Sequence, residues 1–573
     1  MSHLAAGLPA DPPGRATIPP ASRRLNGARL TDYALLIAVA AALTLPNLGV
    51  SSLWDVDEGV NAEAAREMQE AGTWVIPTFN FELRTAKPVM LYWVQRASYA
   101  AFGVSEWSAR LPSVLAAWLT ILLTYELARR MFGRGTGLLG GIVLASAIEF
   151  CVLAHAATPD ATLLLFTTLT FYLFWIGQEN GGRRWWVPVG AACGLAMLTK
   201  GPVGVALPGM VIGLYFLWNR ELRRLFDRRM LWGALAFLLV AGPWYGLVTS
   251  ETRGAWAKAF FLNENVNRAL TSMEDHNGPF FYHAVALLAL FAPWSIFLID
   301  SLWFGVKAAR LEDRPHRFLI CWFAAYLLCF SLVQTKLPNY VLPLYPALAI
   351  LTARFLVRWR EGELEVRRWA MPGSTFGMLL VGIVTVGGLL AAGGTLPIPA
   401  MRTYPGLETW AALGIVPLIG AGFMVRYLRR GDRRGFVRAV AIATVLFVGL
   451  LAAFPASEMD AYKAPRELVL SSGVADSSRD VRVASYDWFQ PSVVFYAKRH
   501  VEKLSSVEKA AEFLAVPTPG YLFVTEPTWN AWVANKVTTK HHRVARHFDF
   551  YRNCHVLVIT NEMAVEQARC TDR

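Results

Sequence analysis

Long apolar runs separated by short polar stretches dominate the chain from Tyr33 to Phe454. Each run has roughly the 17 to 25 residues that an α-helix needs to cross a bilayer. A membrane β-barrel would instead show short segments of alternating apolar and polar residues. The pattern therefore predicts about thirteen transmembrane helices, near residues 31–49, 108–128, 136–154, 161–178, 186–199, 203–219, 231–249, 281–303, 318–334, 339–358, 375–394, 407–426 and 435–455.

Two segments fall outside this pattern. Pro88–Phe102 is apolar but short, and it is either a further span or a helix lying in the membrane interface. Beyond Pro455 the composition turns polar, and the runs VRVASY, SVVFYA, GYLFVT and HVLVIT predict the strands of a small α/β domain. We expect a tail over 1–30, an all-α multi-pass membrane domain over 31–455 with a large first external loop over 50–107, and an α/β domain over 456–573.

Lysine and arginine orient the predicted helices. Alternate loops contain ARRMFGRG, GGRRWW, NRELRRLFDRRM, VKAARLEDRPHR, RWREGELEVRRW and RYLRRGDRRG, and the N-terminal tail is basic as well. Basic loops stay in the cytoplasm, so the N-terminus is cytoplasmic. An odd number of spans then places the C-terminal domain on the other, non-cytoplasmic side of the membrane. The polar, proline-rich start shows no cleavable signal peptide, and we expect the first helix to be retained.

The composition supports this class. The 573 residues are 55% hydrophobic and only 17% charged, which is too apolar for an ordinary soluble enzyme. The net charge of +13 follows from the orientation of the helices, and we expect no nucleic-acid partner. Among six cysteines, Cys554 and Cys570 fall in the exported domain, where an oxidising compartment permits a disulfide between them.

Ionisable residues gather on the non-cytoplasmic side of these predicted helices. They are Asp55, Asp57 and Glu58 after the first span, His155 and Asp160 after the third, Lys200 after the fifth, Glu264, Arg268, Asp275 and His276 after the seventh, and Lys336, Tyr340 and Tyr345 after the ninth. An ionisable group at the membrane edge is costly and indicates a functional site. Carboxylates beside several cations suit the transfer of a group from a lipid phosphate, because cations bind the phosphate while a carboxylate assists the acceptor.

Simpler interpretations stay open for single residues. The acids of the first loop suit the start of an interfacial helix, the lysines can extend to head groups, and His155 and His276 can be structural. Glu63 and Glu67 are expected on a solvated helix face, with Glu63 spaced to pair with Arg66. A transporter or lipid flippase is a second class of function, although the polar residues gather at one face rather than at the midplane.

Several motifs resemble those of a known family. They are the pair Asp57–Glu58, KPVMLYW at Lys87–Trp93, RLP at Arg110–Pro112, TPDATLLLF, LTKGP, ENVNR with HNGPFFYH, and TKLPNYVLPLYPALA. Over Trp54–Ala349 the chain is similar to the bacterial GT-C glycosyltransferases related to protein O-mannosyltransferases, and within them to the lipid A 4-amino-4-deoxy-L-arabinose transferases.

The resemblance implies the GT-C fold, a place in the bacterial inner membrane with the active site and the C-terminal domain in the periplasm, and an activity. A member of this family would move 4-amino-4-deoxy-L-arabinose from undecaprenyl phosphate to a lipid A phosphate on the periplasmic face, a lipopolysaccharide modification that gives polymyxin resistance. The alternative within enzymes is transfer of another sugar, such as a mannose-like hexose or galacturonic acid, to a lipid or protein. We expect the bilayer, the donor and lipid A as partners, and a monomer.

The resemblance also assigns roles. The catalytic acids would be Asp57 with its companions Glu58 and Asp55, and Asp160; the donor phosphate would be bound by Lys87, Arg268, Lys200, Lys336, Tyr340 and Tyr345; and Glu264 with His276 would hold a divalent ion, with no obligatory cofactor. The chain departs from its relatives at Val60, where they often carry a basic residue, and in RTAKP, where they often carry Tyr and Glu. Arg84 would replace part of the lost charge and contact the donor phosphate.

Overall fold

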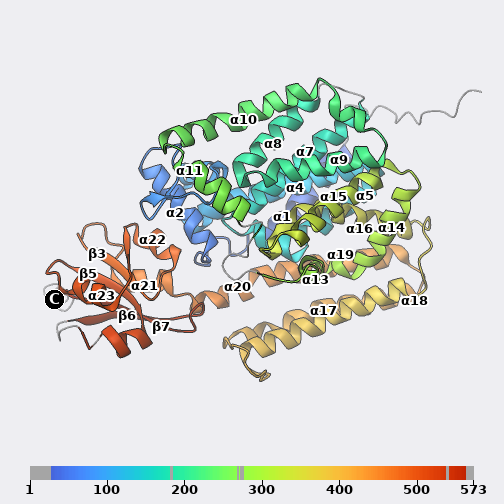
Figure 1. Cartoon of the computed structure of the whole chain (residues 1–573). Helices are drawn as coiled ribbons and strands as arrows, with labels where there is room; N and C mark the ends of the chain where they lie inside the picture. Colours follow the sequence, from blue (N-terminus) through green and yellow to red (C-terminus); the bar gives the residue numbers. More distant parts are fainter. Residues whose placement is uncertain are drawn as a thin grey trace, which may run out of the picture.

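The computed structural model describes residues 27–180, 185–267, 270, 277–533, 535–536 and 541–562. Helices occupy the larger, N-terminal part of the chain, and a small domain with a five-stranded sheet follows at its C-terminal end (Figure 1). The expected order of a helical region before an α/β domain is therefore confirmed.

The segment between α1 and α4 (Glu106–Phe132), which was predicted as a large loop, is itself structured. After α1 (Gly27–Thr44) come α2 (Asp57–Glu70), the antiparallel pair β1 (Thr78–Phe79) and β2 (Glu82–Leu83), and α3 (Met90–Phe102). Asp57 and Glu58 open α2, where the N-terminal end of the helix dipole favours carboxylates. The 13 residues of α3 rise about 20 Å, too little to cross a hydrocarbon core of about 30 Å. This segment is a short helix packed on α2 and α4, not a full span.

The helical region continues through a series of elements. They are α4 (Glu106–Phe132), α5 (Arg134–Ala145), α6 (Ile148–Ala154), α7 (Pro159–Glu179), α8 (Trp186–Lys200), α9 (Val203–Trp218), η2 (Leu222–Phe226), α10 (Met230–Glu251), α11 (Ala255–Lys258), η3 (Ala259–Asn267), α13 (Tyr282–Leu290), η4 (Trp294–Phe297), α14 (Leu298–Arg310), α15 (Arg314–Leu332), η5 (Pro338–Leu344), α16 (Tyr345–Arg360), α17 (Ala370–Gly393), η6 (Leu407–Gly414), α18 (Ile415–Arg429) and α19 (Arg433–Ala453).

Within the described part of the chain, 8 helices are long and apolar enough to cross a membrane, or up to 10 if each bent pair forms one span. The bent pairs are α5 with α6, at 66°, and α13 with η4 and α14, at 117°. The expected spans at 31–49, 186–199 and 203–219 are helical too, as α1, α8 and α9, but they are not among these ten. A multi-pass helical membrane domain is confirmed, and the number of about thirteen spans stays a prediction.

Burial separates the centre of the helical region from its periphery. In the span formed by η5 and α16, 89% of the apolar window is buried, whereas in α10 and α17 only 22% is buried. The exposed positions of α17 are apolar, for example Phe376, Ile383 and Val384. Such a helix requires an apolar surrounding, which the hydrocarbon of a bilayer supplies.

The C-terminal domain contains a mixed sheet of order β4-β3-β5-β7-β6. Its elements are α20 (Pro455–Glu458), η7 (Met459–Tyr462), α21 (Ala464–Ser472), β3 (Arg482–Tyr486), α22 (Pro491–Ala497), β4 (Val501–Leu504), α23 (Val507–Ala515), β5 (Gly520–Thr525), α24 (Glu526–Thr528), η8 (Trp529–Val533), β6 (His542–Asp549) and β7 (Cys554–Thr560). The strands β3, β4 and β5 are parallel, and β7 runs antiparallel to β5 and β6.

Three of the four runs predicted as strands are confirmed as β3, β5 and β7. The prediction for SVVFYA is wrong, because this run forms α22. Pro491 occupies the first turn of that helix, where its missing N–H is no loss and its fixed φ suits the helix. Cys554 opens β7, and Cys570 lies outside the described residues, so their disulfide stays a prediction.

The C-terminal domain docks on the segment between α1 and α4. Helix α22 packs against α2 (Figure 1). On the other side of the loop, the Asn80 side chain donates to Val501 O at 2.9 Å and accepts from Val501 N at 2.8 Å. The amide of Asn80 thus pairs with the edge strand β4 as a neighbouring strand would.

Candidate functional site

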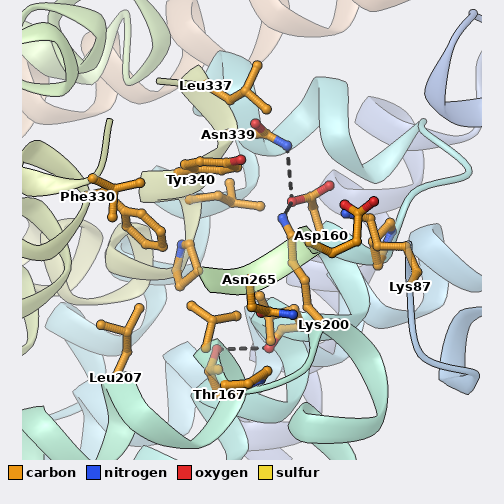
Figure 2. A pocket seen from close by; sticks show the side chains of 18 of the residues that line it. Lys87, Asp160, Thr167, Lys200, Leu207, Asn265, Phe330, Leu337, Asn339 and Tyr340 are labelled. Atoms are coloured by element: carbon orange, nitrogen blue, oxygen red, sulfur yellow. Dashed lines mark hydrogen bonds and ion pairs between the residues drawn. The ribbon is translucent and has the colours of Figure 1, made fainter. Parts of the chain in front are cut away.

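Two distant motifs meet in an ion pair. Asp160, from TPDATLLLF, lies in the first turn of α7, and Lys200, from LTKGP, ends α8. Lys200 Nζ lies 2.6 Å from Asp160 Oδ1, and Asn339 Nδ2 donates to the same oxygen at 3.2 Å (Figure 2). Asp160 is only 5% exposed, so both charges are largely removed from water and depend on each other.

A cavity of about 300 Å³ surrounds this pair. Its polar part carries Asp57, Lys87, Thr158, Asp160, Lys200, Glu264, Asn265, Asn339 and Tyr340. Its apolar part is built from α7, α9, α15 and η5 and includes Leu163, Leu207, Phe330, Val333 and Leu337. Figure 2 shows Lys87, Asp160 and Lys200 on one side of this space and Phe330 with Leu207 on the other. A cavity divided in this way suits a ligand with a charged head and an apolar tail.

A second cavity, of about 450 Å³, adjoins the first one. Its polar walls include Asp55, Asp57, Glu58, Arg110 and His155, and its apolar walls include Ile148, Val152, Val448 and Leu451. Asp57 and Thr158 line both cavities. The side chain of Asp57 is exposed, so its carboxylate stands at the boundary where contents of the two cavities can meet.

Each carboxylate oxygen of Glu58 accepts two hydrogen bonds. Its Oε1 accepts from Arg110 Nε at 2.9 Å and from Ala157 N at 2.7 Å. Its Oε2 accepts from Arg110 Nη2 at 2.7 Å and from Trp54 N at 2.8 Å. Burial opposes the charge of Glu58, but the Arg110 guanidinium and these N–H groups hold its pKa below the usual value. Glu58 therefore braces the site and has no free lone pair directed at a substrate.

Arg110, from the RLP motif, uses its remaining donors on the loop before α2. It donates to Leu48 O, Ser51 O and Ser52 O at 2.7 to 2.9 Å, so all five N–H groups of its guanidinium are engaged. The Glu58–Arg110 pair thereby joins α2 and α4 to the segment that leads into α7 and Asp160.

Asp55 turns towards the C-terminal domain. Ser492 N donates to Asp55 Oδ1 at 2.9 Å, Ser492 Oγ donates to Asp55 Oδ2, and Tyr551 Oη donates to the Asp55 carbonyl at 2.8 Å. Burial raises the pKa of Asp55 to about 7, against the lowering effect of the Ser492 donors. Asp55 therefore makes a contact between the two domains, and its expected role as a catalytic companion of Asp57 stays a prediction.

Three of the residues expected at the donor phosphate lie elsewhere. Lys336 Nζ donates to Phe330 O, Ser331 O and Val333 O, which satisfies the carbonyls at the end of α15. Tyr345 is fully buried beside Phe291 and lines neither cavity. Arg84 donates to Tyr92 Oη at 2.7 Å and to Asn61 Oδ1 at 3.1 Å, outside both linings. Their motifs are near the site, but the side chains of Lys336 and Arg84 are hydrogen-bonded to other parts of the protein, and that of Tyr345 is packed in the core.

The expected metal ligands are only partly described. Glu264, in η3, lines the first cavity, whereas Arg268, Asp275 and His276 lie outside the described residues. The residues that the structure describes contain no group of three or more His, Cys, Asp or Glu side chains placed to hold a metal ion. The divalent ion and the phosphate contact of Arg268 therefore stay predictions.

Glu63 and Glu67 are not on a solvated face, and this expectation is wrong. Glu63 is 0% exposed and pairs through both oxygens with Arg66, at 2.6 and 2.7 Å, as its spacing predicted. Glu67 accepts from Phe81 N at 3.1 Å. α2 lies between α3 and α22, so even its polar positions are covered.

Sequence reasoning missed several residues of the site. Asn339 is not among the predicted site residues, although it directly precedes Tyr340 in the motif TKLPNYVLPLYPALA. An amide donor close in sequence to Lys336 and Tyr340, two candidates for binding the phosphate, is the signal that the sequence offers. Arg110 was recognised only as part of RLP. Ser492 had no signal, because nothing in its local sequence connects it with a loop more than 400 residues earlier.

Comparison with known proteins finds glycosyltransferases whose names include a polyprenyl phosphate-linked sugar. Residues 86–245 match the family described as dolichyl-phosphate-mannose-protein mannosyltransferase. A Pseudomonas aeruginosa PAO1 protein named undecaprenyl phosphate-alpha-4-amino-4-deoxy-L-arabinose arabinosyl transferase is 31% identical over 432 residues, which cover 70% of this chain and 75% of that protein. An uncharacterized Aquifex aeolicus protein is 33% identical over 332 residues, which cover 57% of this chain and 64% of that protein.

The fold has a solved counterpart. The crystal structure of ArnT from Cupriavidus metallidurans bound to undecaprenyl phosphate aligns with a TM-score of 0.78 and 24% sequence identity. The alignment covers 94% of this chain and 99% of that structure, so the likeness extends over both the helical region and the C-terminal domain. This likeness confirms the GT-C fold, whereas the number of spans and the side of the membrane on which the C-terminal domain lies stay predictions.

Proposed function

The chain belongs to the family of undecaprenyl phosphate-alpha-4-amino-4-deoxy-L-arabinose arabinosyl transferases, and we propose that it transfers 4-amino-4-deoxy-L-arabinose from undecaprenyl phosphate to a phosphate of lipid A. It is a glycosyltransferase that uses a polyprenyl-phosphate-linked sugar. The observation that carries the proposal is the place of Asp57, whose side chain lines both cavities. A transfer between two lipids requires one point that both head groups reach.

The first cavity is proposed to hold the donor. Lys87 and Lys200 supply positive charge at its polar end, and Tyr340 and Asn339 supply further polar groups. A phosphate is favoured there by charge-assisted hydrogen bonds. The apolar walls formed by α7, α9, α15 and η5 would receive the first units of the polyprenyl chain. Arg268, outside the described residues, is proposed to add a further cation.

The second cavity is proposed to admit the acceptor. In the transfer, an oxygen of the lipid A phosphate forms a bond to the anomeric carbon of the sugar while the bond from that carbon to the donor phosphate oxygen breaks. Undecaprenyl phosphate leaves with the electron pair of the broken bond, and Lys87 with Lys200 stabilises the charge that it gains. Asp57 orients the acceptor and stabilises positive charge at the anomeric carbon. Asp160 keeps Lys200 in place.

The same proposal includes the setting of the enzyme. We propose an inner-membrane protein of about thirteen spans, with a cytoplasmic N-terminus and with the cavities and the C-terminal domain in the periplasm. The basic loops support this orientation. Tags at the N-terminus and in NRELRRLFDRRM should report cytoplasm, and a tag after Pro455 should report periplasm. A cytoplasmic C-terminus would contradict the site assignment.

Transfer by the purified protein in detergent is the decisive test. The protein is incubated with undecaprenyl phosphate-linked 4-amino-4-deoxy-L-arabinose and lipid A, and mass spectrometry measures lipid A that has gained the sugar. Product without a membrane gradient excludes a pure transporter. Donors with a mannose-like hexose or galacturonic acid test the alternative sugars, and a chelator added to one sample tests whether a divalent ion is required. No product with the arabinose donor and product with another would overturn the sugar assignment.

A further inference from the structure

Asp57 lies in the short segment 52–58, which leads into α2. The C-terminal domain binds the beginning of this segment. Ser52 N donates to Asp460 Oδ1 at 2.8 Å, and Leu53 N donates to Tyr496 Oη, in α22, at 2.8 Å. Asp55 then binds Ser492 through both carboxylate oxygens. On the C-terminal side, Glu58 is fixed to the membrane domain through Arg110. Asp57 thus lies in a short segment that is fastened at both ends by different parts of the molecule.

At Gly59, α2 approaches α22 too closely to leave room for a side chain. A Cβ atom at Gly59 would lie 2.6 Å from Ser492 N and closer still to Asp55 Oδ1. Position 59 therefore has to be glycine for the Asp55–Ser492 contact to form. Tyr551, which follows β6, closes the contact from the other side by donating to the Asp55 carbonyl.

We propose that Asp55 is a positioning residue, through which the C-terminal domain sets the place of the Asp57 carboxylate between the two cavities. The inference rests on the proposed function. Asp55 lines the second cavity, but both of its carboxylate oxygens bind Ser492, so we place it beside the reaction and not in contact with the reacting atoms. Its loss would move Asp57 relative to the sugar, and a misplacement of about 1 Å can lower a rate by about 10²-fold.

The conservative substitution distinguishes positioning from chemistry. In Asp55→Asn, the amide oxygen can still accept from Ser492 N, and the amide NH₂ can donate to Ser492 Oγ, so the contact survives without a carboxylate. Asp55→Ala removes both hydrogen bonds, and Ser492→Ala removes one. Matched controls in the same domain are Asp480→Ala and Ser471→Ala, since Asp480 is exposed and the Ser471 hydroxyl bonds only within α21.

The transfer assay and hydrogen exchange measure the two sides of this inference. We expect Asp55→Ala to lower kcat by about 10- to 100-fold with an unchanged KM for the donor, whose phosphate contacts are elsewhere. Ser492→Ala should show a smaller loss of kcat, and Asp55→Asn should stay within about threefold of the wild type. Amides of α22 and of residues 52–58 should exchange faster in Asp55→Ala and Ser492→Ala but not in Asp55→Asn or the controls.

Each contrary result has a defined meaning. If Asp55→Asn is as inactive as Asp55→Ala while its exchange is unchanged, Asp55 acts in the chemistry and the inference fails. Full activity of both Asp55→Ala and Ser492→Ala would also overturn it. If Asp55→Ala does not fold, Ser492→Ala, which lacks only a hydroxyl, carries the test. If the wild type makes no product, the proposed function fails, and unchanged exchange in Ser492→Ala would separately contradict the contact.

Discussion

Glu58 and Arg110 bind each other through two hydrogen bonds of 2.9 and 2.7 Å, and each uses its remaining capacity on backbone groups of neighbouring segments. Two adjacent acids at the start of α2 therefore have different tasks. Glu58 is enclosed and saturated with donors, whereas Asp57 is exposed at the boundary of two cavities. The difference predicts opposite outcomes for substitutions at neighbouring positions.

Glu58→Gln is expected to destabilise the protein. The side-chain NH₂ group of the glutamine would face N–H donors, because both carboxylate oxygens of Glu58 accept from Arg110 and from a backbone N–H, of Trp54 or Ala157. Arg110 would also lose its buried counter-charge. Removing one partner of a buried ion pair costs about 3 to 5 kcal/mol of unfolding free energy. Thermal unfolding of the purified protein in detergent measures this effect, with exposed Glu82→Gln in β2 as the control. Equal midpoints for the two variants would argue against the bracing role.

Asp57→Asn is expected to abolish most turnover without loss of stability. The amide keeps the size of the side chain but removes the charge that orients the acceptor and stabilises the sugar carbon, so kcat should fall by about 10² or more. The thermal midpoint should stay near that of the wild type, because the side chain is exposed. Steady-state transfer and thermal unfolding are measured on the same preparation. A fully active variant would remove Asp57 from the mechanism.

Lys87→Ala is expected to weaken donor binding. Lys87 lies at the polar end of the first cavity, and loss of a hydrogen bond from a charged group costs about 1.5 to 3 kcal/mol. Binding of undecaprenyl phosphate to the purified variant measures the effect. Lys258→Ala in α11 is the control, since Lys258 is exposed and lines neither cavity. Identical affinities for both variants would show that Lys87 does not contact the phosphate.

The contribution of Asp55 to stability should depend on pH. Burial raises its pKa to about 7 from an ordinary value of 3.8. Within this net rise, the charge of Asp549 in β6 acts in the same direction as burial, whereas the Ser492 donors and Lys463 act against it. Because the folded protein keeps a proton that the unfolded chain has lost, this stabilisation is complete below about pH 4 and is lost as the pH rises to about 7.

The matching measurement compares thermal midpoints of the wild type and Asp55→Asn across this range. The amide cannot titrate, so the midpoint of the wild type should fall relative to that of Asp55→Asn as the pH rises from about 4 to about 7. Above that range the difference should become constant. A difference that is independent of pH throughout would mean that the Asp55 carboxyl titrates at its ordinary value.

Two acids that share Arg66 should differ in their contributions to stability. Glu63 is 0% exposed, so Glu63→Gln is expected to cost about 3 to 5 kcal/mol of unfolding free energy. Glu70 binds the same guanidinium but its side chain is 58% exposed, so Glu70→Gln should cost at most about 1 kcal/mol. Thermal unfolding of the two variants measures the contrast, and a larger loss for Glu70→Gln would contradict it.

The sequence predicted the class of fold and much of the site for identifiable reasons. Long apolar runs mark membrane helices because the bilayer imposes a length. The order of these runs also predicted that Asp160 and Lys200 lie on the same side, but not that they form an ion pair. The helical nature of α22 was missed because a short apolar run around Val493 and Val494 has no distinguishing period.

The role of individual acids was harder to predict. Asp55, Asp57, Glu58 and Glu63 lie within nine positions of each other, and residue type alone makes them equivalent. Their differences come from partners in distant parts of the chain, namely Ser492 for Asp55 and Arg110 for Glu58. The first contact depends on how the C-terminal domain docks and the second on how α2 packs against α4, and no local pattern encodes either.

The adjoining cavities have a kinetic consequence. If each hydrophobic substrate occupies its own cavity and only their head groups meet at Asp57, neither lipid has to leave before the other can bind. The enzyme would then work through a ternary complex with no sugar held on the protein between two half-reactions. Initial rates measured against both substrates should give intersecting rather than parallel reciprocal plots. Undecaprenyl phosphate could then leave through the first cavity while the glycosylated lipid A leaves through the second.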